Sequence, residues 1–382
     1  MNTIYLDHAA TTPMAKEAIV RMTGAMEDLY GNASSIHATG REARKYLDEA
    51  RAALAHSIHA QANEIIITSG GTEADNMAIF GTAYARKTEG NHIITTQVEH
   101  HAVLHACEKL EKEGFNVTYL PVDETGRVRV EDVAAALQDD TILVTIMYGN
   151  NEVGTIQPIA EIGMLLKDHQ ATFHTDAVQA YGIEYLDVEL LGVDLLSVTA
   201  HKINGPKGIG FLFARQGVKL ESLLYGGSQE KKRRAGTENI PAVIGFAAAV
   251  QKAAEAREAN RRKYNGFKRL LIKQFDEAEI SYKVNGTLDE TLPHVLNVSF
   301  PGTNVESFLV NLDMEGVHVS SGSACTAGSI DPSHVLVAMF GDSAEAIRSS
   351  IRFSFGIGLT EEDIVEAGKR TAAIVKRLVK NK

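Results

Sequence analysis

The strongest constraint on the fold is a regular alternation of short apolar runs and longer amphipathic stretches between about residues 15 and 215. Helical patterns such as EARKYLDEARAALAHSI and HAVLHACEKLEKEG separate runs that have the length and composition of strands. This order predicts a doubly wound α/β layer on a largely parallel sheet. The predicted strands are EIIIT (64–68), HIITT (92–96), VTYLP (117–121), TILVTIMY (141–148), ATFHTD (171–176), DLLSVT (194–199) and GFLFA (210–214).

A different pattern begins after Pro241. The helical run AVIGFAAAVQKAAEAREANRRKYNGFKRLLIKQF is too long for an ordinary globular helix, so we expect it to bridge two domains, with Gly266 as a candidate bend. Beyond it, HVLNVSF, VHVSS and SSIRFSFG are typical of strands, and VESFLVNLDME and EEDIVEAGKRTAAIVKRLV of helices. Thr360 and Asp363 have nearly the spacing of a capping box before the last helix. This region predicts a smaller α+β domain, because 382 residues exceed the usual size of one core.

Composition excludes several classes of function. The net charge of −11 argues against a nucleic-acid binder, and we interpret the short basic run KKRR (231–234) as a solvated loop. No apolar run is long enough for a membrane helix, and MNTIYLDHAATTP lacks the pattern of a secretory signal. Two cysteines provide neither a disulfide framework nor a zinc site. We therefore expect a cytoplasmic enzyme that contacts neither membranes nor nucleic acid directly.

Three motifs at predicted strand ends could carry chemistry. Glycines in SGGTEADN (69–76) could form a phosphate cradle at a helix N-terminus, or only a tight turn. Asp176 in FHTDAVQ could meet a cationic ligand group, or cap the next helix. Lys202 in AHKINGPKGIG could form a Schiff base, or be an ordinary surface lysine. Together the three motifs provide the contacts that pyridoxal 5′-phosphate needs at its phosphate, its ring nitrogen and its aldehyde. This match favours one cofactor site over three unrelated structural roles.

The complete motif series resembles that of the cysteine desulfurases of the NifS/IscS type, which are class V aminotransferase-like enzymes of pyridoxal-phosphate fold type I. The resemblance runs in order from residue 5 to about residue 356. It rests on YLDHAATTP, GNASSIH, SGGTEADN, EHHAV, YGNNEVGTIQP, HTDAVQ, AHKINGPKGIG, RAGTEN, SGSAC and IRFSFG.

The resemblance implies a large cofactor-binding domain (15–255) with a mostly parallel mixed sheet flanked by helices. It also implies a smaller α+β domain (1–14 and 256–382) that carries a cysteine loop at about 321–335. The setting of that loop, SGSACTAGS, is similar to the long-loop branch of the family, which delivers sulfur directly to several acceptors.

The resemblance also implies the contacts with pyridoxal phosphate. Lys202 would bind the aldehyde and then move the Cα proton of the substrate, Asp176 would pair with the ring nitrogen, and His100 would stack on the ring. His101 fits the ring role less well. Thr237 would reach the phosphate of a neighbouring subunit, which implies a homodimer. Part of the basic run KKRR could then lie near that phosphate or at a partner surface instead of in a solvated loop. The remaining cofactor contacts would be Asn151 and Gln179 at the ring's 3′-oxygen side and Gly71, Thr72, Thr199 and His201 at the phosphate; Thr199 keeps the hydroxyl of the serine that many relatives have.

The substrate roles follow in the same way. Arg352 would hold the carboxylate of L-cysteine in a bidentate fork, with Asn32 and Asn151 sharing the substrate contact. Cys325 would take the substrate sulfur as a persulfide, release alanine and pass the sulfur to acceptor proteins for iron–sulfur cluster assembly, tRNA thiolation or both. The small residues around Cys325 suit a loop that must move. No resident metal is implied, and Cys325 could serve only as a transient ligand of an iron–sulfur cluster.

Other interpretations remain open. Cys325 could be an incidental exposed thiol, whereas Cys107, within a helical pattern, is expected to be a buried structural thiol. A selenocysteine lyase or a pyridoxal-phosphate aminotransferase would use much of the same site. A sulfur carrier or scaffold would not need Lys202, Asp176 and His100 together.

Overall fold

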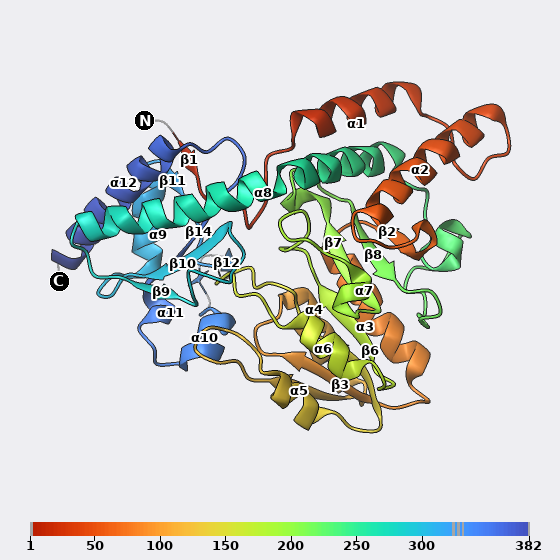
Figure 1. The fold of residues 1–382 in the computed structure, drawn as a ribbon, viewed down its shortest axis with the longest axis horizontal. Coiled ribbons are helices and arrows are strands. Elements are labelled where there is room, and N and C mark those ends of the chain that lie inside the picture. The colour runs from red at the N-terminus through yellow and green to blue at the C-terminus, as the bar shows by residue number, and fades with distance from the viewer. Residues whose placement is uncertain (1–2, 323–324, 327–328, 331, 381–382) are drawn as a thin grey trace.

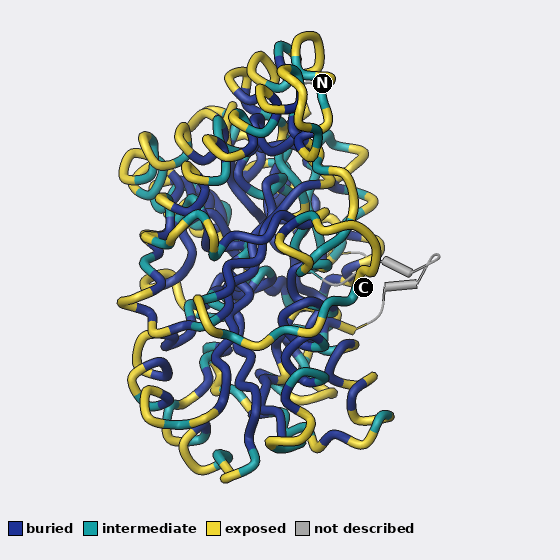
Figure 2. The backbone as a smooth tube through the Cα atoms, turned by 90° about the vertical axis from the view of Figure 1, so that its right-hand side faces the viewer, coloured by how far each residue is buried: buried dark blue, intermediate teal, exposed yellow. Residues whose placement is uncertain are grey.

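The computed structural model describes residues 3–322, 325–326, 329–330 and 332–380. Figure 1 shows a larger body that holds the central sheet and a smaller body that holds both chain ends, connected by the long helix α8 (Ile240–Glu277). In Figure 2 a buried trace runs through the middle of the molecule, and exposed segments form its rim. Among the described residues, no helix has both the length and the apolar composition that a bilayer crossing requires.

The larger body is built on a seven-stranded sheet in the order β2-β8-β7-β6-β5-β3-β4. Strand β8 runs antiparallel to both of its neighbours, and the other strand pairs are parallel. Every strand lies within a predicted run or one residue beside it, so the predicted α/β fold class with a mostly parallel mixed sheet is confirmed. The strands are β2 (Ile65–Thr68), β3 (His92–Thr96), β4 (Asn116–Leu120), β5 (Thr141–Thr145), β6 (Thr172–Asp176), β7 (Leu195–Thr199) and β8 (Gly210–Ala214).

Helices cover both faces of this sheet because strand side chains alternate between them. On β8, Phe211 and Phe213 join the larger core, which includes Phe246 of α8, whereas Leu212 packs with Met77 of α3 on the other face. A strand that is buried on both faces has a continuous apolar sequence, as GFLFA does. The helices of this body are α1 (Lys16–Asp28), α2 (Ala38–His56), α3 (Gly71–Arg86), α4 (His101–Lys112), α5 (Val130–Ala136), α6 (Ile159–Leu166) and α7 (Val188–Leu191), with short 3-10 helices η1 (Ala62–Glu64), η2 (Ala200–Lys202) and η3 (Gln229–Lys232).

Helix α8 connects the two bodies, as its length predicted. Its first turns pack on α1 and α2, and its last turns pack on α12 (Glu361–Lys380). Phe246 near its start lies in the larger core, and Phe267 and Phe275 near its end lie in a second core. Gly266, the candidate bend, lies inside the helix without interrupting it. The helix is a single element of 38 residues, about 57 Å long at the usual rise per residue.

The smaller body has a three-stranded antiparallel sheet in the order β14-β10-β9 and a short parallel pair of β1 and β11. Its core brings Leu6, near the chain start, together with Phe353 and Val375. The predicted capping box is confirmed, since Thr360 and Asp363 each accept a hydrogen bond from the other's backbone N–H. The elements are β1 (Ile4–Tyr5), β9 (Lys283–Asn285), β10 (Val295–Ser299), α9 (Val305–Met314), β11 (Val317–His318), α10 (His334–Phe340), α11 (Ala346–Ser349) and β14 (Ser350–Ser354). The two separate cores support the division at residues 14 and 256, which stays a prediction.

Candidate active site

A cavity of about 380 Å³ opens between the carboxyl ends of the parallel strands and the smaller body. The position is expected, since ligands of open α/β sheets bind outside the carboxyl ends of the strands. The smaller body contributes Ser320, Gly322, His334 and Arg352 to the wall. Most of the residues predicted from the sequence line this one cavity, namely Gly71, Thr72, His100, Asn151, Asp176, Gln179, Thr199, His201, Lys202 and Arg352.

Lys202 lies in η2, directly after β7, so the strand end fixes the base of its side chain. Its Nζ donates a hydrogen bond to the carbonyl oxygen of Ala10 at 2.7 Å, and another to Ala9. Burial, followed by the charge of Arg352, lowers the pKa of Lys202 from 10.5 to about 8, although Asp7 and Asp176 oppose this shift. An amine with such a pKa is neutral often enough near neutral pH to attack a carbonyl carbon.

Asp176 is the last residue of β6 and is almost fully buried. Its Oδ1 accepts a hydrogen bond from the backbone N–H of Val178 at 2.9 Å. The segment that follows is a turn, so the alternative role as a helix cap does not apply here. Burial raises the pKa of Asp176 to about 6, although the Val178 hydrogen bond and Lys202 oppose the rise. The site therefore has a carboxyl group suited to meet a cationic group.

The glycine motif forms a helix N-terminus at the cavity wall. α3 begins at Gly71, directly after Gly70, whose φ of 153° favours glycine. A Cβ on Gly71 would lie only 2.7 Å from Cγ2 of Val178, so the close approach of these two segments requires glycine. The first backbone N–H groups of a helix have no acceptor within it. Together with the Thr199 hydroxyl nearby, they make an anion cradle, which favours the ligand-binding interpretation over an empty turn.

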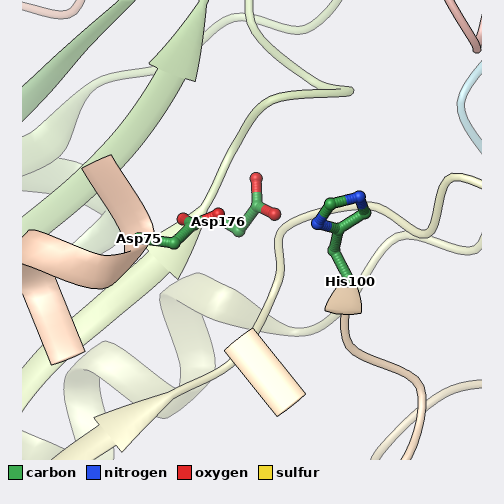
Figure 3. Close-up of side chains that lie close together, drawn as sticks. All are labelled: Asp75, His100 and Asp176. Carbon is green, nitrogen blue, oxygen red and sulfur yellow. The ribbon is translucent and has the colours of Figure 1, made fainter. Parts of the chain in front are cut away.

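His100 precedes α4, and its Nδ1 accepts a hydrogen bond from the N–H of Ala102 at 3.2 Å, which fixes the ring. The ring reaches the open cavity beside Asp176 (Figure 3). Burial, followed by the charge of Lys202, lowers the pKa of His100 to about 4, so the imidazole is neutral at pH 7. His101 also lines the cavity, but its ring packs against His334, with centroids 4.8 Å apart. This packing supports His100 as the residue that meets a ligand ring.

Arg352 lies on β14 with only 4% of its surface exposed. Its Nη1 donates to the carbonyl oxygen of Asn151 at 2.9 Å, and its Nη2 donates to Oδ1 of Asp7 at 2.8 Å. Its Nε is buried and has no hydrogen-bond partner among the described residues. A buried guanidinium at a cavity wall is suited to an incoming carboxylate.

The chain near residue 10 crosses the cavity and holds two further predicted residues. Gln179 donates a hydrogen bond from Nε2 to the carbonyl oxygen of Ala9 at 3.0 Å, and its Oε1 lies 3.1 Å from Nε2 of His294. Nδ1 of His201 lies 3.1 Å from Oγ1 of Thr11. Both side chains are thus fixed before any ligand binds, which is the preorganisation a cofactor site requires.

Two predicted residues lie outside the cavity of the single chain. Asn32 is exposed, and its side chain accepts a hydrogen bond from the N–H of Ser34 at 2.8 Å. Thr237 is also exposed, close to Arg234 of the basic run KKRR. Arg234 pairs with Glu73 in the first turn of α3 at 2.7 Å, so part of this run lies beside the anion cradle rather than in free solution. The roles of Asn32 and Thr237 stay predictions.

The structure describes the surroundings of one of the two cysteines. Cys107 is fully buried on α4, and burial raises the pKa of its thiol, which confirms the expected buried thiol. The backbone of Cys325 lies in β12 (Cys325–Thr326), which pairs with β13 (Ser329–Ile330). The side chain of Cys325 and much of the predicted loop lie outside the described residues, so their roles stay predictions.

Several site residues were not singled out from the sequence. Asp7 pairs with Arg352, and Asp75, Glu152 and His334 line the cavity. Glu99 is fully buried and accepts a hydrogen bond from the backbone N–H of Met147, which lines the cavity; burial raises the pKa of Glu99 to about 8. Asp7 and Asp75 fall inside the motifs YLDHAATTP and SGGTEADN, but a single acidic residue in a motif gives no sign that it will be buried.

The mixed α/β sheet and the lysine, carboxyl and anion cradle at one strand edge define a protein of pyridoxal-phosphate fold type I. The chain belongs to the aminotransferase class-V family, whose family model matches residues 4–366. The expected relation to NifS/IscS-type cysteine desulfurases is confirmed by the relatives that follow.

The chain is 59% identical to a Bacillus subtilis (strain 168) protein named "Putative cysteine desulfurase IscS 1", over 99% of this chain and 100% of that protein. Among solved structures, a "NIFS-LIKE PROTEIN" has a TM-score of 0.92 at 33% identity and covers 98% of this chain and 100% of its own. The structure titled "SspA in complex with cysteine" has a TM-score of 0.81 at 36% identity, covering 92% of this chain and 99% of its own.

Proposed function

We propose that this chain is a cysteine desulfurase that depends on pyridoxal 5′-phosphate. It removes sulfur from L-cysteine, releases L-alanine and carries the sulfur as a persulfide on Cys325. The observation that carries the proposal is the meeting of Lys202, Asp176 and the N-terminus of α3 in one cavity. It is supported by near full-length similarity to proteins named as cysteine desulfurases.

The residues of the cavity fit pyridoxal phosphate. The phosphate would meet the N–H groups of Gly71 and Thr72 and the hydroxyl of Thr199, where a negative charge is favoured. The ring nitrogen would meet Asp176, and the aldehyde would meet the amine of Lys202. When bound, the cofactor supplies an electron sink for bonds at the substrate's Cα. Arg234 is partly neutralised by Glu73, which leaves the helix N-terminus as the main anion-binding element.

Arg352 and Lys202 position and activate the amino acid in this proposal. Arg352 lines the cavity, and the Nη2 bonded to Asp7 is available if the substrate carboxylate replaces Asp7. Lys202, with its pKa near 8, can accept a proton from Cα and return one to carbon. His100 remains neutral and lies against the ring position.

The sulfur step belongs to Cys325. Its thiolate attacks the sulfur of the bound cysteine, a sulfur–sulfur bond forms, and the substrate's carbon–sulfur bond breaks with its electron pair left on carbon. Protonation of that carbon gives alanine. The persulfide is then transferred to an acceptor protein, for iron–sulfur cluster assembly, tRNA thiolation or both.

The proposal includes a cytoplasmic homodimer with a smaller domain that carries the Cys325 loop. Thr237 would complete the phosphate site of the neighbouring subunit, and its exposure in the single chain supports this. The pairing of Arg234 with Glu73 also places the segment before Thr237 next to the cradle of its own chain. A symmetric dimer could then place one exposed segment at each shared site.

The test uses the purified full chain with pyridoxal phosphate, L-cysteine and a thiol reductant, measuring alanine and sulfide together. Cys325→Ala should make neither product yet still bind cysteine at the cofactor, seen as a spectral change. Cys107→Ala is the matched control and should keep activity, because Cys107 is buried away from the cavity lining. Full activity of Cys325→Ala would refute its role, and a strong preference for selenocysteine would indicate a lyase instead.

A further inference from the structure

A second acidic side chain lies at the floor of the cavity. Asp75, on α3, is 1% exposed and lines the same cavity as Asp176. One carboxylate oxygen of each residue and one ring nitrogen of His100 lie within 4.8 Å of one another. Figure 3 shows the two carboxyl groups side by side with the His100 ring beyond Asp176. The proposed reaction assigns no role to Asp75.

Among the described residues, Asp75 forms no ion pair with a lysine or an arginine, and its one candidate partner is a histidine. Its Oδ1 is buried and has no hydrogen-bond partner among the described residues. Nε2 of His174 lies 3.7 Å from this oxygen, which is too far for a hydrogen bond. The two ring nitrogens of His174 already have hydroxyl partners, Thr145 at 2.8 Å and Ser197 at 2.9 Å. Burial also lowers the pKa of His174 to about 3, so this imidazole is neutral.

The charges that face Asp75 are mostly negative. Burial and the charge of Asp176 raise the pKa of Asp75 well above its usual value, and Glu99 adds to the rise, while a side-chain hydrogen bond with Ser197 opposes it. Lys202 favours the ionised form of Asp176, and it is not among the causes that act on Asp75. Two buried carboxyl groups this close cannot both ionise at low cost, so one of them holds a proton.

We propose that Asp75 is the protonated member of this pair and donates a hydrogen bond to Asp176, so that the two carboxyl groups share one negative charge, held on Asp176. Asp75 is then a positioning residue that acts through Asp176. The consequence rests on the proposed function: a hydrogen bond that stabilises ionised Asp176 makes it less basic, so the proton between Asp176 and the ring nitrogen stays on the ring.

The first test needs no cofactor and compares the wild type with Asp75→Asn as full chains. If native Asp75 holds a proton that the unfolded chain releases, the native state binds more protons above about pH 4, and stability falls as pH rises. Relative to Asp75→Asn, the folding equilibrium constant of the wild type should fall about tenfold per pH unit until native Asp75 ionises. Asp48→Asn, at an exposed acid on α2, is the control and should keep the wild-type slope. Identical slopes for the wild type and Asp75→Asn would overturn the proposal.

The second test asks whether the donor matters to Asp176. The Asp75→Asn variant keeps an N–H donor at this position, whereas Asp75→Leu keeps similar volume without one. Pyridoxal phosphate should bind Asp75→Leu at least about tenfold more weakly than Asp75→Asn, measured by absorbance. Equal binding by the two variants would refute the positioning role. Failure of the wild type to bind the cofactor would refute the proposed function. The dependence of folding stability on pH would still test whether Asp75 holds a proton.

A metal ion is the competing occupant, because it would need both carboxyl groups ionised. Zn²⁺ alone, added to the cofactor-free wild type and to Asp75→Asn, tests this by thermal unfolding. If Asp75 is protonated, Zn²⁺ should change the unfolding temperature of the two proteins by the same small amount. Stabilisation of the wild type alone would show an ionised pair and overturn the proposal.

Discussion

Replacement of Arg352 by glutamine should raise the pKa of Lys202. Burial is the largest cause that lowers this pKa from 10.5 to about 8, and the charge of Arg352 is the next. Arg352 is also bonded to Asp7 at 2.8 Å, so its loss would free a carboxylate that favours the charged form of Lys202. The two effects have the same sign, and burial of Lys202 keeps the pKa below 10.5.

The magnitude follows from the fraction of neutral amine. At pH 8 about half of the Lys202 side chains should be neutral in the wild type, against roughly 0.3% for a lysine with a pKa of 10.5. A rise of about one unit, equivalent to ~1.4 kcal/mol, would reduce the neutral fraction at pH 8 to about one tenth. The reaction of the amine with an aldehyde should then slow about fivefold.

The assay mixes cofactor-free protein with pyridoxal phosphate at a series of pH values and traps the product with borohydride. The rate should rise with a midpoint near pH 8 for the wild type and about one unit higher for Arg352→Gln. Arg41→Gln, on α2 outside the cavity lining, is the control and should not move the midpoint. A wild-type midpoint near 10.5, or the same midpoint for Arg352→Gln, would refute the reasoning.

Two further predictions concern stability. Burial lowers the pKa of Lys268 to about 7, so the native chain binds fewer protons than the unfolded chain between about pH 7 and 10.5, and stability rises with pH there. In urea unfolding, Lys268→Met should lower the slope of the free energy of unfolding against pH by up to about 1.4 kcal/mol per pH unit. An unchanged slope would contradict the lowered pKa of Lys268. Arg51→Met should cost about 3–5 kcal/mol, because it leaves the buried carboxylate of Glu230 without its partner at 2.6 Å. Lys45→Met, which removes an exposed ion pair, should change stability by less than ~1 kcal/mol, and equal losses would contradict the burial argument.

Local patterns were sufficient to predict most of the fold. The run GFLFA is apolar throughout because β8 is buried on both faces, and the run after Pro241 is long because α8 serves two cores. The pairing of β1 with β11 brings Ile4 beside Val317, and no local pattern encodes a contact over such a separation. Likewise, the sequence does not show that β8 runs antiparallel to its neighbours, because a strand buried on both faces has the same apolar pattern in either direction.

The sequence predicted the site residues that are chemically reactive and also stand at the end of a predicted strand. Lys202 and Asp176 follow strands, and strand ends of a parallel sheet meet at one edge. Asp75 could not be found in this way, because it lies within a helix and its burial depends on β6 and β7 packing against α3. Asp7 could not be found from local pattern either, because its partner Arg352 lies far away in the sequence. Both are acidic residues whose role depends on tertiary contacts.

The transfer of sulfur from L-cysteine to Cys325 is tested most directly by mass spectrometry. The protein with bound pyridoxal phosphate reacts with L-cysteine in the absence of reductant, and the mass of the peptide that contains Cys325 is then measured. We expect this peptide to gain the mass of one sulfur atom, alanine to appear in equal amount, and Lys202→Ala to abolish both. The peptide containing Cys107 should stay unmodified because that thiol is fully buried. Alanine formation without added sulfur on Cys325 would show that Cys325 does not receive the substrate sulfur.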